Sequence, residues 1–184
     1  MVDPIQKILK GCLRNNKLDQ YQFYARYSKK MFGICLRYAS SYEEAQDILQ
    51  EGFIKVFQKL PSYKGNGSLE GWIKKIFVNK AIEKYRERVY HLSLDEGIND
   101  YEVDVHQNHG PAMLHTRDIL NFVQGLPIQY RLVFNLYALE GYNHNEIAEI
   151  LDISESTSRS NLTRARMILK NKLDVEFKAV VRAV

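Results

Sequence analysis

The sequence predicts an all-α protein built of two small helical domains that are joined by an acidic, flexible linker. Apolar residues recur every three or four positions from Ile5 to Leu60, from Leu69 to about Arg88, and from Ala112 to Leu173. Almost no stretch alternates apolar and polar residues as a half-buried strand would. At 184 residues with 45% hydrophobic content, the chain is long enough to bury a core in each of two domains.

The run from Glu43 to Leu60 predicts a helix with one buried face and one polar face. The buried stripe consists of Ala45, Ile48, Leu49, Phe53, Val56, Phe57 and Leu60. The polar positions are Glu43, Glu44, Asp47, Gln50, Glu51 and Gln58. Ile54 departs from this pattern because it projects into the polar face. An apolar residue ringed by hydrogen-bonding groups is typical of a docking anchor for a protein partner, and the alternative is an isolated surface isoleucine.

A polar loop with two glycines, residues 61–68, separates this helix from a second amphipathic helix that begins at Leu69. The second helix is basic through Lys74, Lys75, Lys80, Lys84, Arg86 and Arg88, and it carries Trp72 and Tyr85. Cations beside aromatic rings suit a single-stranded DNA ligand. Trp72 lies in the apolar stripe, so we expect it in the core rather than under a base. Lys80 interrupts that stripe, which weakens the helix prediction past Phe77.

The predicted linker covers residues 91–111, and we therefore expect domains at 1–90 and 112–184. The segment has no Lys or Arg, and its acidic residues are Asp95, Glu96, Asp100, Glu102 and Asp104. Gly97, Gly110 and Pro111 disfavour regular structure in it. Fully extended, the segment would span roughly 70 Å, which would allow two DNA-contacting domains to occupy separate grooves.

The stretch from Tyr142 to Leu169 predicts a helix-turn-helix within a C-terminal domain of four helices. Ile147, Ala148, Ile150 and Leu151 give the first helix an apolar face. Asp152 is expected in the turn because it tolerates left-handed backbone better than most residues. Ser154 is placed to cap the second helix, with Glu155 near its positive end. The core stripe of that helix is expected to be Leu162, Ala165, Leu169 and Leu173.

The outer face of the second helix carries short polar residues and arginines. Ser156, Thr157, Ser160, Thr163 and Arg164 lie opposite the core stripe, with Asn161 beside them. Arg164 and Asn161 have side chains that can pair with guanine or adenine edges, whereas Arg159, Arg166 and Lys170 suit phosphates. A solvated basic face is the alternative, but a capped helix after a short turn favours binding to duplex DNA.

Composition excludes several classes of protein. The formal net charge is +4 and the sequence pI is about 8.9, with acidic and basic residues segregated along the chain. Cys12 and Cys35 lie in helical runs, so we expect reduced, buried thiols rather than a disulfide framework or a zinc site. No apolar run is long enough to span a membrane, and residues 1–10 lack the apolar centre of a signal peptide, which predicts a cytoplasmic protein.

Three stretches, in their order, resemble the bacterial RNA polymerase sigma factors of the extracytoplasmic-function group, a group of small two-domain sigma factors. The resemblance extends from about Tyr21 to Leu173. The three stretches are residues 44–53, then Trp72-Ile73 with Ile76, Asn79, Glu83 and Arg86, then Leu126-Pro127 through Glu140-Gly141 to Glu146-Ile147-Ala148 and Arg164-Ala165-Arg166.

The resemblance implies a subunit that directs promoter-specific initiation with core RNA polymerase and needs no cofactor or metal. Its implied contacts with the clamp helices of the largest polymerase subunit are Asp47, Gln50, Glu51 and Ile54, and the polymerase flap is a second contact. The implied residues for the melted minus-10 element are Tyr63, Lys64, Asn66, Lys74, Lys75, Asn79, Glu83 and Arg86, with a flipped base held by the loop. Those for the duplex minus-35 element are Ser156, Thr157, Arg159, Ser160, Asn161, Thr163, Arg164 and Arg166. Whether an anti-sigma protein masks either domain stays open.

This sequence departs from the pattern of the group at three positions. Asp152 stands where the group often has Gly, Ser158 where it usually has Val, and Asn161 where a basic residue is common. The base preference at the minus-35 element is therefore open. Ser158 places a hydroxyl near the packing face of its helix, where it either loosens the domain or forms a hydrogen bond to a carbonyl one turn back.

Two other classes of function are alternatives to this one. A conventional dimeric helix-turn-helix regulator would bind a palindromic site without polymerase, whereas a sigma factor binds two unlike elements together with it. An enzyme would have to use His91, His106, His109 and His115, with Asp104 as a metal ligand. The spacing of these histidines fits no common zinc pattern, so we expect them to be solvated and the protein not to be an enzyme.

Overall fold

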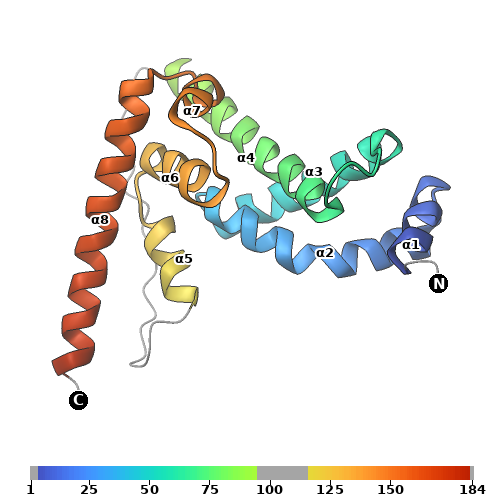
Figure 1. Ribbon diagram of the computed structural model, residues 1–184, viewed down its shortest axis with the longest axis horizontal. Helices are drawn as coiled ribbons and strands as arrows, with labels where there is room; N and C mark the ends of the chain where they lie inside the picture. The colour runs from blue at the N-terminus through green and yellow to red at the C-terminus, as the bar shows by residue number, and fades with distance from the viewer. Residues whose placement is uncertain (1–3, 95–115, 183–184) are drawn as a thin grey trace. The chain divides into compact units, whose positions relative to one another are not determined.

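The computed structural model describes the backbone of residues 4–94 and 116–182 and the side chains of residues 4–88 and 120–174. Within those residues every element is helical, which confirms the predicted all-α class (Figure 1). The chain divides into two compact units, Met1–Tyr85 and Arg86–Val184. The acidic residues of the predicted linker, together with His106, His109 and His115, lie outside the described residues.

The N-terminal unit is built from four α-helices and a short 3-10 turn. They are α1 (Pro4–Leu13), α2 (Lys17–Tyr38), α3 (Tyr42–Lys59), η1 (Leu60–Ser62) and α4 (Leu69–Leu94), which continues beyond the unit. Asn16 caps α2 by accepting hydrogen bonds from the backbone N–H groups of Leu18 and Asp19, and Ser41 caps α3 by accepting one from Glu44. These caps satisfy N–H groups that a helix start leaves without partners.

The core of this unit is aromatic and aliphatic. Phe23, Met31, Ile48 and Phe77 are fully or almost fully buried. The Phe53 and Phe77 rings meet edge to face with centroids 5.2 Å apart, which brings α3 against α4. The close approach of the two helices depends on a glycine, Gly52 of α3, because a methyl group there would lie 2.6 Å from Cδ1 of Phe77.

The described residues of the C-terminal unit that follow α4 form four α-helices and one π-helical turn. After the end of α4 they are α5 (Thr116–Gln124), α6 (Ile128–Phe134), η2 (Asn135–Leu139), α7 (His144–Leu151) and α8 (Glu155–Arg182). Asn143 and Glu146 form a reciprocal capping box at the start of α7. Asp152 then adopts left-handed backbone with φ of 54°, and Ser154 accepts a hydrogen bond from the Thr157 N–H at 3.0 Å. The predicted turn and cap of the helix-turn-helix are confirmed.

Helix α8 packs against α6 and α7 along one face (Figure 1). Leu162 and Ala165 are buried in this packing as expected. Leu173, which was expected in the same core stripe, is not buried, since 38% of it is exposed. Arg131 of α6 is completely buried, and its Nη1 donates a hydrogen bond of 2.8 Å to the carbonyl of Gln124 at the end of α5. This bond joins α6 to the preceding helix.

Candidate functional site

The outer face of α3 presents an acid, an amide and an isoleucine in one row. Asp47, Gln50 and Ile54 are spaced three and four residues apart, so they lie on the same side of the helix. All three are exposed, Ile54 at 58%. The opposite side, which includes Ala45, is buried in the core. The helix therefore holds these three side chains on a rigid support, and we call them the α3 outer row.

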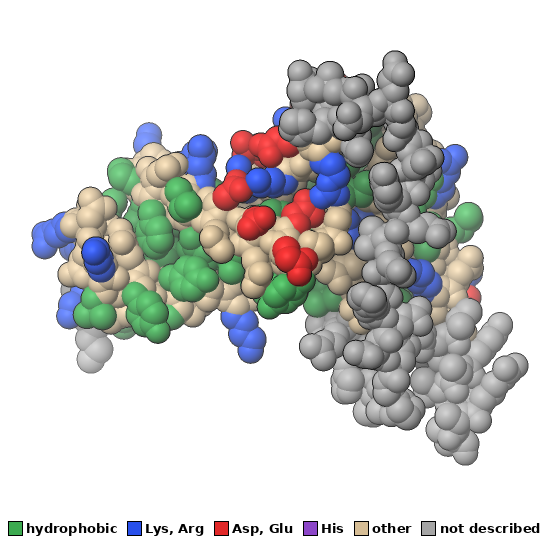
Figure 2. Space-filling model, turned by 180° about the vertical axis from the view of Figure 1, so that it is seen from behind, with side chains coloured by type: hydrophobic (Ala, Val, Ile, Leu, Met, Phe, Trp, Pro, Cys, Tyr) green, Lys and Arg blue, Asp and Glu red, His purple; other side chains and the backbone are tan. Residues whose placement is uncertain are grey.

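Glu51, expected in the same surface, is paired within the chain. Its carboxylate lies 2.6 Å from Lys80 Nζ and 2.7 Å from Lys84 Nζ, both on α4. Burial by itself would raise the pKa of Glu51, but hydrogen bonds and charge from the two lysines outweigh it and lower the pKa. Figure 2 shows Asp and Glu side chains lying next to Lys and Arg side chains on one face of the molecule. Glu51 thus joins α3 to α4. Because its carboxylate is already paired, it is less available to a protein partner than the residues of the α3 outer row.

The interruption of the apolar stripe at Lys80 does not break the helix, because α4 continues to Leu94. The lysine is half-buried between two carboxylates, Glu51 at 2.6 Å and Glu83 at 3.2 Å. Burial alone would lower the pKa of Lys80, but the hydrogen bonds and charge of both carboxylates raise it, so the ammonium form is favoured. Because two carboxylates compensate its charge, Lys80 can lie within the apolar stripe of α4.

The loop between η1 and α4 is closed by Tyr63. Its hydroxyl donates a hydrogen bond of 3.1 Å to the carbonyl of Gly67, and its ring contacts Trp72 with centroids 5.1 Å apart. Gly67 has φ of 85°, which a residue with a side chain would adopt only under strain. Trp72 is half-buried, so it lies at the edge of the core and supports the loop. Lys64 and Asn66 are exposed at the tip of this loop.

The residues expected to follow the loop on α4 share one side of that helix. Lys75, Asn79, Glu83 and Arg86 are spaced four, four and three residues apart, and each is exposed. Lys74 is half-buried beside them. A loop rich in hydrogen-bonding groups and a helix face with two cations, an amide and a carboxylate thus form one continuous polar segment of the chain. We call it the loop-α4 surface.

The outer face of α8 carries most of the residues expected to contact duplex DNA. Ser156, Arg159, Ser160, Thr163, Arg164 and Arg166 are exposed, and Thr157 is half-buried at the cap. The Arg159 Nε donates a hydrogen bond of 2.9 Å to Glu155 one turn earlier. The Ser160 and Thr163 hydroxyls donate to backbone carbonyls of α8 and keep their lone pairs available as acceptors.

Asn161 differs from its expected position beside this outer face, because it is only 4% exposed. It faces the packing side of α8 together with Ser158, Leu162 and Ala165, which are also buried. The packing face of α8 is wide because both α6 and α7 contact this helix. A buried amide is not available to a ligand on the outer face, so Asn161 supports the outer face of α8 rather than forming part of it.

The buried Ser158 hydroxyl has a partner that the sequence did not indicate. Ser158 Oγ and His144 Nδ1 are 2.9 Å apart, so the hydroxyl joins α8 to the first residue of α7. The His144 ring stacks on Tyr137 with centroids 4.7 Å apart and an interplanar angle of 23°. Burial and the neighbouring Arg159 lower the pKa of His144, which favours its neutral form. A polar pair therefore takes the place of the apolar contact that the resemblance implied.

Two arginines of α8 lie against tyrosines of α6 and η2. The Arg164 Nη1 donates a hydrogen bond of 3.2 Å to the Tyr130 hydroxyl, and its guanidinium carbon is 5.9 Å from the centre of the Tyr130 ring. The guanidinium carbon of Arg166 is 5.6 Å from the centre of the Tyr137 ring. Sequence reasoning missed both tyrosines, and their seven-residue spacing, two helical turns, is the only signal that links them.

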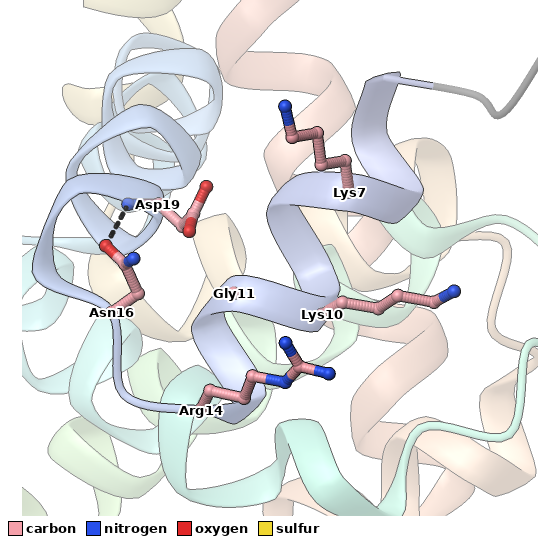
Figure 3. A pocket seen from close by; sticks show the side chains of 6 residues that line it. All are labelled: Lys7, Lys10, Gly11, Arg14, Asn16 and Asp19. Atoms are coloured by element: carbon pink, nitrogen blue, oxygen red, sulfur yellow. Dashed lines mark hydrogen bonds between the residues drawn. The ribbon is translucent and has the colours of Figure 1, made fainter.

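A hollow of about 460 Å³ lies in the N-terminal unit, and none of the residues of these surfaces lines it. Figure 3 shows Lys7, Lys10 and Arg14 extending from α1 and its end, with Asn16 and Asp19 at the start of α2. The N–H groups there already donate to Asn16, and the Asp19 side chain lies against Gly11. Asn16 thus accepts these hydrogen bonds, and Asp19 supplies the anion of the hollow. We therefore do not include the hollow in the candidate site.

The part of the chain that the structure describes contains no group of three or more His, Cys, Asp and Glu residues arranged to hold a metal ion. Among the same residues, no helix is both long and apolar enough to cross a membrane. Cys12 and Cys35 are buried free thiols, and burial raises their pKa values to about 11 and about 12 respectively, so both stay protonated near neutral pH.

Comparison with known proteins places both units in one family. The family model described as sigma-70 region 2 matches residues 23–89, and the model described as sigma-70 region 4 matches residues 116–169. An extracytoplasmic-function (ECF) RNA polymerase sigma-E factor of Haemophilus influenzae is 29% identical over 160 residues, which cover 81% of this chain and 84% of the relative. The sigma-E factor of Escherichia coli K12 is 28% identical over 175 residues, which cover 87% and 91%.

Two solved structures share the fold. One is the sigma factor RpoE in complex with the anti-sigma factor NepR from Bartonella quintana, with a TM-score of 0.55 and 22% identity, covering 85% of this chain and 98% of that one. The other is CnrH in complex with the cytosolic domain of CnrY, with a TM-score of 0.50 and 20% identity, covering 94% and 99%.

Proposed function

We propose that the two units of this chain contact different parts of a promoter through the surfaces described above. The chain belongs to the sigma-70 family and is a sigma factor of the extracytoplasmic-function group. As a member of this group the chain binds core RNA polymerase and directs promoter-specific transcription initiation. The residue assignments below are our proposal, as is the division into domains at residues 1–90 and 112–184. Since its role is to bind and position, we expect it to catalyse no reaction, and to act in the cytoplasm with polymerase and DNA.

The α3 outer row is the proposed docking site for the clamp helices of the largest polymerase subunit. The observation that carries this assignment is the 58% exposure of Ile54 on the same side of α3 as Asp47 and Gln50. Burying an exposed isoleucine inside a polar rim is a common source of binding energy at protein interfaces. Glu51 is left out of the direct contacts because it already pairs with two lysines of α4.

Alanine substitutions in the α3 outer row test this assignment. Ile54→Ala combined with Asp47→Ala should weaken binding to core polymerase by at least about tenfold, because anchors of this kind contribute more than 1 kcal/mol each. Lys55→Ala is the matched control, since Lys55 is exposed on another side of the same helix. Binding is measured by titrating labelled full-length chain with core polymerase. Equal binding by the double variant and the control would refute the docking surface.

The loop-α4 surface is the proposed site for the non-duplex minus-10 element. Tyr63, Lys64 and Asn66 supply a ring and hydrogen-bonding groups for an extruded base, and Lys74, Lys75, Asn79, Glu83 and Arg86 follow along α4. Extruding a base from the duplex costs a few kcal/mol. Contacts with the extruded base and with the single strand offset this cost only where the DNA sequence fits the protein. The Tyr63 hydrogen bond to Gly67 supports this role, because a closed loop needs less ordering when it binds.

The outer face of α8 is the proposed reader of the duplex minus-35 element. Arg164 is assigned to a base edge, Arg159 and Arg166 to phosphates, and Ser156, Thr157, Ser160 and Thr163 to shorter contacts. Arg164→Ala should weaken recognition of the element by about 1 to 3 kcal/mol, and only for sequences that carry the preferred base pair. An equal loss on every sequence would make Arg164 a phosphate contact instead.

A dimeric helix-turn-helix regulator is not favoured, because the relatives named above are sigma factors and both family models belong to sigma-70. Regulation by an anti-sigma protein is a further proposal. It is supported by the two structural neighbours, each of which was solved in complex with such a partner or with the cytosolic domain of another protein. Co-purification of the full chain with a partner that blocks polymerase binding would test it.

A further inference from the structure

The contact between Arg164 and Tyr130 restrains the orientation of the Arg164 side chain. The hydroxyl of Tyr130 accepts a hydrogen bond from Arg164 Nη1, and the ring of the same tyrosine faces the guanidinium group. A hydrogen bond fixes one edge of the guanidinium plane, and contact with a ring face restricts its tilt. Arg164 is otherwise exposed, so without Tyr130 its long side chain would sample many rotamers.

The support under this contact is rigid. Tyr130 is followed in α6 by Arg131 and Leu132, whose side chains are 0% and 1% exposed. Arg164 is followed in α8 by Ala165, which is completely buried in the packing of α8. The two partners are therefore carried by helices whose adjacent residues are fixed in the core. Their separation is set by the packing of α6 against α8 rather than by a flexible loop.

Base recognition needs such an orientation more than phosphate binding does. Reading a guanine edge requires two coplanar N–H donors at a defined angle, whereas a phosphate accepts hydrogen bonds from many directions. Arginine has five N–H donors, so one of them can bind Tyr130 while enough remain for a bidentate contact. Arg166, proposed as a phosphate contact, meets Tyr137 through the ring face.

We propose that Tyr130 is a positioning residue that sets the base preference of the minus-35 surface by orienting Arg164. This inference rests on the proposed role of Arg164 and adds to it a residue outside the helix-turn-helix. Without the Tyr130 hydroxyl, the positive charge of Arg164 stays in place, but the plane of its guanidinium group is no longer fixed. The protein then keeps most of its affinity for DNA and loses selectivity at the base pair that Arg164 reads.

The test uses the full chain bound to core polymerase and promoter duplexes randomised over the minus-35 element. Selection with the wild-type protein and with Arg164→Ala first identifies the base-pair position at which Arg164 matters. Tyr130→Phe should then reduce the preference at that position by about 3- to 10-fold, the effect of one net hydrogen bond, and leave preferences at other positions unchanged. Tyr137→Phe is the matched control and should change none of them.

Further variants separate positioning from stability and from the role of Arg164. Tyr130→Phe should have no effect on selectivity in the Arg164→Ala background, and its unfolding midpoint should equal that of Tyr137→Phe. Tyr130→Leu, which also removes the ring, should lower the preference at least as far. A uniform loss of affinity on all sequences, an unchanged preference, or a sharper one would overturn the inference. If Arg164→Ala itself alters no preference, it is the base-reading role that fails.

Discussion

Substitution of Gly52 by alanine probes the α3–α4 contact that supports the N-terminal surfaces. The added methyl group would meet three atoms of the Phe77 ring, including Cδ1 at 2.6 Å and Cζ at 2.8 Å. Phe77 is completely buried and contacts Phe53 edge to face, so it has no free space to move into. Overpacking of this kind costs about 1 to 3 kcal/mol. Replacing a glycine within a helix gains about 0.5 to 1 kcal/mol.

The net expectation for Gly52→Ala is a loss of up to about 2.5 kcal/mol, the difference between those two effects. Gly33 provides a matched control, because it also lies inside a helix and a methyl group there would meet no atom within 4 Å. Gly33→Ala should therefore stabilise the protein by about 0.5 to 1 kcal/mol. Phe77→Leu, introduced into Gly52→Ala, should recover part of the loss because the smaller side chain relieves the clash.

The assay is urea denaturation followed by tryptophan fluorescence. The chain has one tryptophan, Trp72, and it lies in α4 against Tyr63, so its emission reports on the N-terminal unit alone. The free energy of unfolding follows from the midpoint and slope of the transition. If Gly52→Ala stabilised the protein as Gly33→Ala does, α3 and α4 would not approach as closely as the structure has them.

The other predictions concern two side-chain pairs that the structure revealed and the turn at Asp152 that it confirmed. Glu51→Gln should lower the free energy of unfolding by up to about 1 kcal/mol at pH 7, because a partly exposed carboxylate loses two lysine partners. Since folding lowers the pKa of Glu51, that stability is present above its unfolded pKa of about 4.3 and is lost as the pH falls through the folded pKa. Urea midpoints of wild type and variant should therefore converge in acid, and a gap independent of pH would contradict the ion pairs. Ser158→Ala should destabilise the C-terminal unit by about 1 kcal/mol, measured by circular dichroism, and no change would mean that the bond to His144 is not formed. Folding also lowers the pKa of His144, so the unit should lose stability as the pH falls below about 6.5, and His144→Gln should remove that loss. Asp152→Val should cost about 1 to 2 kcal/mol because a β-branched residue is strained at φ of 54°, and equal stability would contradict the left-handed turn.

Local signals predicted the boundary inside the helix-turn-helix, where a turn residue and a cap mark it. Ser154 and Asp152 indicated the turn of the helix-turn-helix because their side chains and backbone act on neighbouring residues. The all-α class followed from periodicity alone. The α3 outer row was also evident, because a helix interior fixes the angle between residues three and four apart.

Contacts between helices were not predictable in the same way. The position of Asn161 in the sequence gives the angle at which its side chain leaves α8. It does not show that α6 and α7 together cover enough of that helix to bury the residue. Lys80 looked like an interruption because its two carboxylate partners lie on α3 and one turn further along α4. The Tyr130 contact joins residues 34 positions apart, and no local pattern reports such a distance.

The most direct measurement is transcription from a randomised promoter library by core polymerase with and without the purified chain. The chain should be retained by core polymerase, and transcripts should begin downstream of two unlike sequence elements at a fixed separation. Arg164→Ala should relax only the upstream element, and alanines in the α3 outer row should abolish the redirected starts. Start sites that are the same with and without the chain would contradict its role as a promoter-selecting subunit.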